Sequence, residues 1–150
     1  MTRVRGVILA GGAGRRMGVA KEGVAVPGGT LLTRAWDALA PLDARPVLQG
    51  ASRAPHGLEP RPDGRPGEGP LAGMETALRA AAGERGGAEG VAFLPLDLPR
   101  VTAPVVLALV ERWRGLPEPG GCAVVVETRR GIQPLAGVYG TGLANGLSTW

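Results

Sequence analysis

The sequence predicts an α/β fold, with a mostly parallel β-sheet that is covered by helices on both faces. Apolar runs of strand length alternate along the chain with stretches whose apolar residues recur at helical spacing. Such alternation is typical of parallel sheets, because right-handed crossovers place the helices on the two faces. The first apolar run is followed by a glycine-rich segment, and α/β proteins often place a loop of this kind where a strand ends.

The first half of the chain predicts three extended segments and one helix. The run Val4–Leu9 is apolar enough for a buried strand. Thr30 is a suitable N-cap for a helix over Leu31–Leu42, which Pro41 and its neighbours would end. A short strand is expected at Pro46–Gln49, and a brief extended piece at Leu58–Arg61.

The second half predicts two helices and three strands. Pro70 is expected in the first turn of a helix that reaches Ala81, and Gly90–Leu96 is expected as a central strand. Thr102 should cap the second helix. The helical spacing of its apolar residues predicts one buried face, made of Val105, Val106, Leu109, Val110 and Trp113. The last two strands, Cys122–Glu127 and Ile132–Tyr139, are close enough to form a hairpin.

Composition limits the class of protein. A chain of 150 residues suits one domain, and its 44% hydrophobic content favours folding despite 26 glycines and 14 prolines. The formal net charge of +4 comes without a basic run, and aromatic residues make up only 3%, so we expect no nucleic-acid partner. No run is long enough to span a membrane. The single cysteine, Cys122, excludes an intrachain disulfide and predicts a reducing, cytoplasmic location.

The glycine-rich segment from Gly11 to Gly18 predicts a phosphate-binding loop. Glycines let backbone N–H groups approach an anion, and Arg16 and Lys21 can neutralise its charge. Lys21 is the only lysine in the chain, and an ammonium is a compact charge suited to phosphate oxygens. The segment is neither a Walker A loop, because Val19 follows Gly18, nor a dinucleotide fingerprint, because Met17 stands where a glycine is required.

Two further segments carry chemistry. Residues 63–73 place Asp63, a flexible loop and a helix N-terminus in succession, and that end of a helix favours an anion or can contact a base edge. The run Pro95–Pro99 places Asp97 at the tip of a buried strand, where one carboxylate could hold Mg²⁺ together with substrate phosphates. In a parallel sheet these loops and the glycine-rich segment all lie at the carboxyl ends of strands, so we expect one composite site.

The motifs occur in an order that resembles the MobA-type molybdenum cofactor guanylyltransferases, which belong to the MobA-like nucleotidyltransferases. They are Leu-Ala-Gly-Gly with Arg-Met-Gly and a nearby lysine, Gly-Pro-Leu-Ala-Gly, Pro-Leu-Asp-Leu-Pro and Gln-Pro-Leu, and they extend from Gly6 to Tyr139. The resemblance implies a three-layer, Rossmann-like nucleotidyltransferase fold with a C-terminal hairpin-like strand pair. It also implies transfer of GMP from GTP to the phosphate of molybdopterin or its molybdenum-loaded form, with Mg²⁺ and release of pyrophosphate.

The resemblance also implies roles for individual residues. Arg16, Lys21 and Asp97 would be catalytic, and Asp97 would hold Mg²⁺. The residues expected to contact GTP are Leu9, Ala10, Gly11, Gly12, Gly14, Arg16, Lys21, Asp63, Gly69, Pro70, Leu71, Gly73 and Asp97. Partners would be GTP and the pterin substrate, with transient contacts to other molybdenum cofactor proteins.

The chain departs from the family pattern in two places. Members often carry an asparagine shortly after the second strand as a base contact, whereas here the segment Gly50–Arg53 offers Ser52. The family also continues for some tens of residues beyond the point where this single domain, residues 1–150, ends. Two alternatives therefore stay open: a cytidylyltransferase acting on the same or another phosphorylated substrate, and a shortened, weakly active nucleotide-binding protein.

Overall fold

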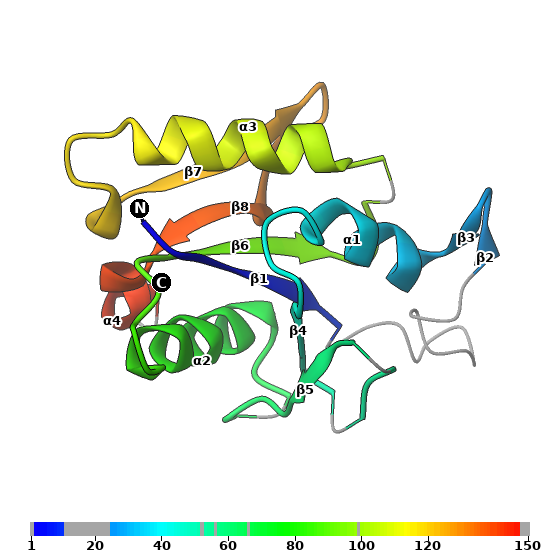
Figure 1. The fold of residues 1–150 in the computed structure, drawn as a ribbon, viewed down its shortest axis with the longest axis horizontal. Coiled ribbons are helices and arrows are strands. Elements are labelled where there is room, and N and C mark those ends of the chain that lie inside the picture. The colour runs from blue at the N-terminus through cyan, green and yellow to red at the C-terminus, as the bar shows by residue number, and fades with distance from the viewer. Residues whose placement is uncertain are drawn as a thin grey trace.

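The computed structural model describes residues 2–10, 25–51, 53–55, 57–65, 67–98 and 100–147. Within them a six-stranded sheet has the order β5-β4-β1-β6-β8-β7 (Figure 1). Its strands are β1 (Val4–Leu9), β4 (Val47–Gln49), β5 (Glu59–Arg61), β6 (Gly90–Pro95), β7 (Ala123–Thr128) and β8 (Gly131–Gly140). The pairs β5–β4, β4–β1 and β1–β6 are parallel, while β8 is antiparallel to both β6 and β7.

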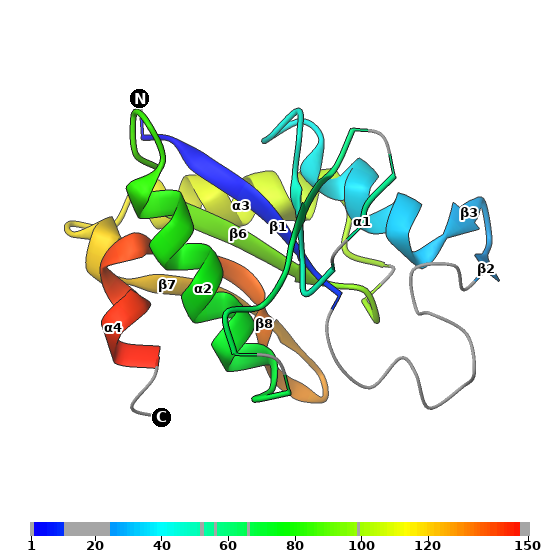
Figure 2. The ribbon, with the colours of Figure 1, turned by 90° about the horizontal axis from the view of Figure 1, so that it is seen from below.

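Helices cover both faces of this sheet. Helices α1 (Leu31–Leu39) and α3 (Ala103–Arg114) pack on one face, and α2 (Pro70–Gly83) and α4 (Ala144–Leu147) pack on the other (Figures 1 and 2). The predicted three-layer α/β architecture with a C-terminal strand pair is therefore confirmed. None of the helices in the described part is long and apolar enough to cross a membrane.

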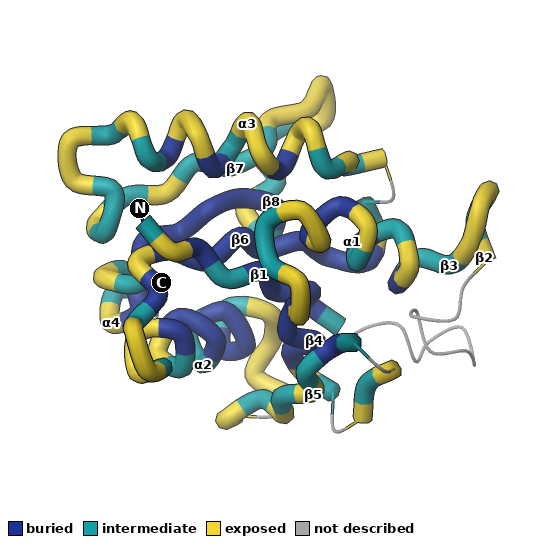
Figure 3. Tube along the Cα trace, in the orientation of Figure 1, coloured by how far each residue is buried: buried dark blue, intermediate teal, exposed yellow. Residues whose placement is uncertain are grey.

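The core lies on the two sides of the central strands, β1 and β6, which are buried along most of their length (Figure 3). The largest side chain in it is Trp113 of α3, whose indole N–H donates to the carbonyls of Pro119 (2.8 Å) and Cys122 (3.2 Å). A Cβ at Gly90 would lie 2.7 Å from the Trp113 ring, so only glycine allows this approach. The buried indole thus ties α3 to the start of the hairpin.

Helix α1 begins where the sequence predicts and ends earlier. The Thr30 hydroxyl accepts from the Thr33 backbone N–H at 3.1 Å, and the Thr33 hydroxyl accepts from the Thr30 N–H at 2.8 Å, which forms a capping box. The helix ends at Leu39 rather than Leu42. Pro41 has no N–H to continue the ladder, and the chain turns there.

Two further predictions about the elements differ from the structure, and one element was not predicted. Val105 was predicted on the buried face of α3, but this residue is 40% exposed. The buried residues of the helix are Val106, Val110 and Trp113. Thr102 stands at the N-cap position without a side-chain hydrogen bond to the helix. A small hairpin, β2 (Ala25–Val26) with β3 (Gly29–Thr30), was not predicted, since two-residue strands leave no periodicity to detect.

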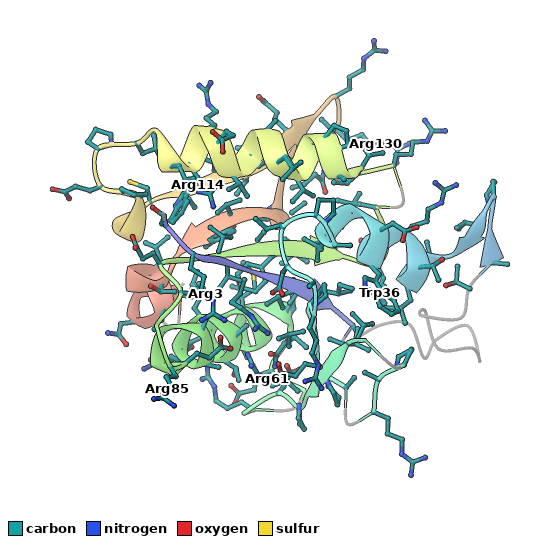
Figure 4. All side chains as sticks on the ribbon, viewed as in Figure 1. Arg3, Trp36, Arg61, Arg85, Arg114 and Arg130 are labelled. Atoms are coloured by element: carbon teal, nitrogen blue, oxygen red, sulfur yellow. The ribbon has the colours of Figure 1, made fainter. Side chains whose placement is uncertain are left out.

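An ion-pair cluster holds together the edge of the sheet where the parallel strands begin. The guanidinium of Arg5 lies 3.2 Å from Asp43, 3.2 Å from Glu59 and 3.6 Å from Glu84. Arg61 adds contacts of 3.0 Å to Glu59 and 3.4 Å to Glu84, which is the C-cap of α2 (Figure 4). This cluster joins β1, β5 and the end of α2.

Candidate active site

A cavity of about 160 Å³ lies at the carboxyl ends of the parallel strands. Its lining comes from β1, β4, the connection after β5, and the first turn of α2. The lining residues are Leu9, Gln49, Asp63, Gly67, Gly69, Pro70 and Gly73. This is the edge at which open α/β sheets bind their ligands. The volume is below that of a pocket for a whole drug-sized ligand, so it suits one part of a larger molecule, such as a base.

The strands that end at this cavity are paired with one another up to their last residues. Leu9 pairs with Gln49, and Gln49 pairs in turn with Arg61. Beyond the last pairs, the Ala10 N–H donates to the Gln49 carbonyl at 3.0 Å, and the Gly50 N–H donates to the Arg61 carbonyl at 2.8 Å. These bonds extend the backbone hydrogen bonding of the strands one residue further, beside the cavity.

Gln49 is the polar side chain most deeply buried at this edge, with 1% of its surface exposed. Its Nε2 donates to Asp63 Oδ1 at 2.9 Å and to the Pro62 carbonyl at 3.4 Å. Because an ionised carboxylate only accepts hydrogen bonds, the contact with Asp63 fixes which way the amide points. The other end of the amide, Oε1, is buried and has no hydrogen-bond donor among the described residues. A buried acceptor without a donor calls for an explanation.

Gly73 allows Asp63 and Gln49 to meet α2. A Cβ at this position would lie 3.0 Å from Asp63 Oδ1 and 3.6 Å from Gln49 Cγ. The absence of a side chain therefore leaves room for the carboxylate that orients Gln49. At the N-terminus of α2, Gly69 has a φ of 86°, which favours glycine, and Pro70 occupies the first turn, where no N–H is needed.

The structure brings part of the predicted GTP site together. Leu9, Asp63, Gly69, Pro70 and Gly73 line the cavity. Ala10 lies at its rim through the bond to Gln49, whereas Leu71 is half-buried and packs against the core on the α2 face. The predicted residues Gly11, Gly12, Gly14, Arg16 and Lys21 lie outside the described residues, as does Ser52. Contact of all these residues with GTP stays a prediction.

Asp97 lies apart from the cavity. It is exposed, two residues beyond Pro95, the last residue of β6, and Pro95 pairs with Leu9. Strands β4 and β6 flank β1, so Gln49 and Pro95, which both pair with Leu9, are separated by roughly 10 Å, twice the spacing of neighbouring strands. No cluster of three or more potential metal-ligating side chains occurs in the described part of the chain. A single carboxylate is still compatible with Mg²⁺, which commonly takes one or two carboxylates and keeps water and substrate oxygens as its other ligands.

Sequence reasoning missed Gln49 and Gly67 as cavity residues. For Gln49 a signal was present, because a glutamine ends a short apolar run that was predicted to be a strand. The family pattern pointed instead to Ser52, in place of the asparagine that other members carry. Gly67 stands in a run of glycine, proline and charge that offered no sign of which residues face the cavity.

Comparisons with known proteins agree with this architecture. The chain is 36% identical over 143 residues to a probable molybdenum cofactor guanylyltransferase of Rhodopirellula baltica, a match that covers 89% of this chain and 66% of that protein. It is 37% identical over 145 residues to one of Deinococcus radiodurans, covering 95% and 70%. The chain therefore spans about two thirds of the length of these relatives.

Solved structures show the same fold. The molybdopterin-guanine dinucleotide biosynthesis protein A of Archaeoglobus fulgidus superposes with a TM-score of 0.67 at 23% identity, covering 97% of this chain and 71% of that one. A cytidylyltransferase from Thermus thermophilus, which acts on 2-C-methyl-D-erythritol 4-phosphate, superposes with a TM-score of 0.59 at 18% identity, covering 95% and 74%. The family model described as the MobA-like NTP transferase domain matches residues 6–150, and the chain belongs to this family.

Proposed function

We propose that this chain transfers GMP from GTP to the phosphate of molybdopterin or its molybdenum-loaded form and releases pyrophosphate. Relatives that are 36% and 37% identical carry the name molybdenum cofactor guanylyltransferase, which supports this substrate pair. The observation that carries the proposal is the Gln49–Asp63 pair in the cavity wall, because its chemistry suits a guanine base.

Hydrogen-bond donors and acceptors favour guanine. Gln49 Oε1 has no donor among the described residues, and the second carboxylate oxygen of Asp63, Oδ2, is not the one that accepts from Gln49. Guanine presents two adjacent donors on one edge, the ring N1–H and the 2-amino group. Cytosine and adenine each present one amino donor beside a ring acceptor, which a carboxylate would repel. Acceptors on two neighbouring side chains, Gln49 and Asp63, would therefore favour GTP over CTP and ATP.

The order of the strands suggests how the rest of the nucleotide lies. With the base against Gln49 and Asp63 near β4 and β5, the triphosphate would cross the end of β1 toward β6 and Asp97. In this arrangement Arg16 and Lys21, which follow β1 in the sequence, would hold the phosphates. Asp97 would hold Mg²⁺, which when bound neutralises phosphate charge as the bond to pyrophosphate breaks.

The chemistry needs no protein nucleophile. An oxygen of the acceptor phosphate attacks the α-phosphorus of GTP, a new P–O bond forms, and the bond from the α-phosphorus to pyrophosphate breaks. The protein contributes by holding both substrates in line and by balancing charge. The cytoplasmic location, the dependence on Mg²⁺ and the contacts with other molybdenum cofactor proteins are part of this proposal.

Nucleotide titrations followed by thermal unfolding test the base assignment. We expect GTP with Mg²⁺ to raise the melting temperature more than CTP or ATP does. Gln49→Met should remove most of the GTP effect, because it deletes the acceptor and leaves Asp63 without its amide partner. Leu48→Met is the matched control, since Leu48 is buried in the core on the other face of the same sheet. Stabilisation by CTP instead of GTP would point to a cytidylyltransferase.

Two further variants test the phosphate side. Asp97→Ala should abolish the part of the GTP stabilisation that depends on Mg²⁺, and Lys21→Arg should weaken binding although it keeps the charge. Pyrophosphate release in the presence of molybdopterin then separates a transferase from a protein that only binds nucleotide. Binding of GTP without turnover would favour the weakly active alternative.

A further inference from the structure

Glu75 of α2 connects the cavity wall to the helix. Its Oε2 lies 2.8 Å from NH2 of Arg65, which belongs to the segment between Asp63 and α2. Its Oε1 accepts from Nε (3.1 Å) and NH2 (2.9 Å) of Arg79, one turn further along the same helix. Each carboxylate oxygen therefore has its own arginine, one on the helix and one on the loop.

The two arginines have different consequences. The Glu75 side chain is 12% exposed, so its charge needs a partner, and Arg79 supplies one from within α2 at the favourable four-residue spacing. The contact with Arg65 is therefore not required to neutralise Glu75. Arg65 is 49% exposed and could be solvated by water if it were released. The Arg65 contact instead fixes the position of the segment after Asp63 relative to α2.

Among its described residues, Arg65 also pairs with Glu68 at 3.0 Å inside the segment, and one other hydrogen bond reaches α2. The Gly64 N–H donates to the Thr76 hydroxyl of α2 at 3.4 Å. Gly67 and Gly69 have φ values of 81° and 86°, and a Cβ at either position would meet nothing within 4 Å. Both glycines line the cavity, and both are exposed. A backbone with so few packed neighbours opens at low free-energy cost unless it is tied at specific points.

We infer that Glu75 is a positioning residue for nucleotide binding: through Arg65 it holds the cavity wall, and with it Asp63, against α2. Asp63 stands two residues before Arg65 and orients the Gln49 amide, so displacement of this segment disturbs both groups that face the base. The inference rests on the proposed function insofar as the ligand is GTP. The contact between Arg65 and Glu75, here called the tether, is present in the protein without any ligand.

Three glutamine variants test the inference. Arg65→Gln and Glu75→Gln each remove the charge pairing that holds the loop. Arg79→Gln is the matched control, because it removes the other partner of the same carboxylate without touching the loop. We expect the first two to raise the Kd for GTP by about threefold to tenfold, and Arg79→Gln to leave it within about twofold of the wild type. The double variant Arg65→Gln with Glu75→Gln should bind no worse than the weaker-binding single variant, since both substitutions remove the same Arg65–Glu75 contact. The other pair that Arg65→Gln removes, with Glu68 at 3.0 Å, lies within the loop and does not reach α2.

Two further measurements separate positioning from general destabilisation. The kcat at saturating GTP should stay near the wild-type value while KM rises, because the tether acts on binding. Hydrogen exchange of the backbone at Asp63–Arg65 should accelerate in Arg65→Gln and Glu75→Gln without nucleotide present, while exchange in β6 stays unchanged.

Equal GTP affinity in Glu75→Gln and the wild type would overturn the inference, as would an equal loss in Arg79→Gln. If the wild-type protein binds no GTP, the proposed function fails instead. The exchange experiment would then still decide whether Glu75 holds the loop.

Discussion

Gly73→Ala is expected to damage the site although it places a better helix former in a helix. In a helix interior, alanine is ordinarily more stable than glycine by about 0.5–1 kcal/mol. At this position the added Cβ falls 3.0 Å from Asp63 Oδ1, so the carboxylate must move by a few tenths of an ångström. That movement lengthens its 2.9 Å bond to Gln49 Nε2. A charge-assisted bond of this kind contributes about 1.5–3 kcal/mol, so its weakening outweighs the gain in helix propensity.

The expected result is a net loss of about 1 kcal/mol in the free energy of unfolding, measured by urea denaturation. Calorimetric titration should show GTP affinity falling by about tenfold, the equivalent of 1.4 kcal/mol. Gly83→Ala is the matched control, because Gly83 ends the same helix and a Cβ there would meet nothing within 4 Å. It should stabilise the protein slightly and leave GTP binding unchanged. If Gly73→Ala stabilises the protein as Gly83→Ala does and binds GTP normally, the close approach of Asp63 to α2 contributes neither to stability nor to GTP binding.

Three other outcomes follow from the packing. Trp113→Ala should lower the free energy of unfolding by about 3–5 kcal/mol in urea denaturation, and a loss below about 1 kcal/mol would contradict its place in the core. Gly57→Ala should cost clearly more than Gly131→Ala in thermal denaturation. Both glycines have positive φ, but only at Gly57 would a Cβ press on the Trp36 ring, at 2.5 Å; equal losses would argue against that contact. Burial raises the pKa of Tyr139, the only tyrosine, above its ordinary value of 10.0. Its contribution to stability is therefore complete below about pH 10 and declines as the pH rises toward the folded-state pKa. Absorbance titration should show phenolate forming at higher pH in the native than in the urea-unfolded protein, and identical midpoints would refute this.

Most of the fold could be predicted because its elements carry their own local signals. Alternating apolar runs gave the strands, and Thr30 and Pro70 marked the starts of two helices. Boundaries were less certain. The end of α1 was wrong by three residues, since helical spacing continues to Leu42 while Pro41 already interrupts the hydrogen bonds. Val105 was assigned to the buried face because helical spacing alone does not fix the width of the contact with the sheet.

The candidate site could be predicted in its location but not in its contacts. The rule that loops meet at the carboxyl ends of strands brought Leu9, Asp63 and the start of α2 together. It gave no indication that Gln49 donates to Asp63, fourteen residues later, because such a contact depends on the three-dimensional path of the loop. Nor could it show that Glu75, which stands among helix-forming residues, would hold Arg65.

The central claim is that the cavity beside β4 and α2 receives the guanine of GTP through Gln49 and Asp63. The most direct test is a crystal structure of the protein with GTP and Mg²⁺. We expect the guanine ring in the cavity, with its N1–H and 2-amino group within hydrogen-bond distance of Gln49 Oε1 and the Asp63 carboxylate, and the triphosphate extending toward Asp97. A bound GTP whose base lies outside this cavity, or touches neither side chain, would contradict it.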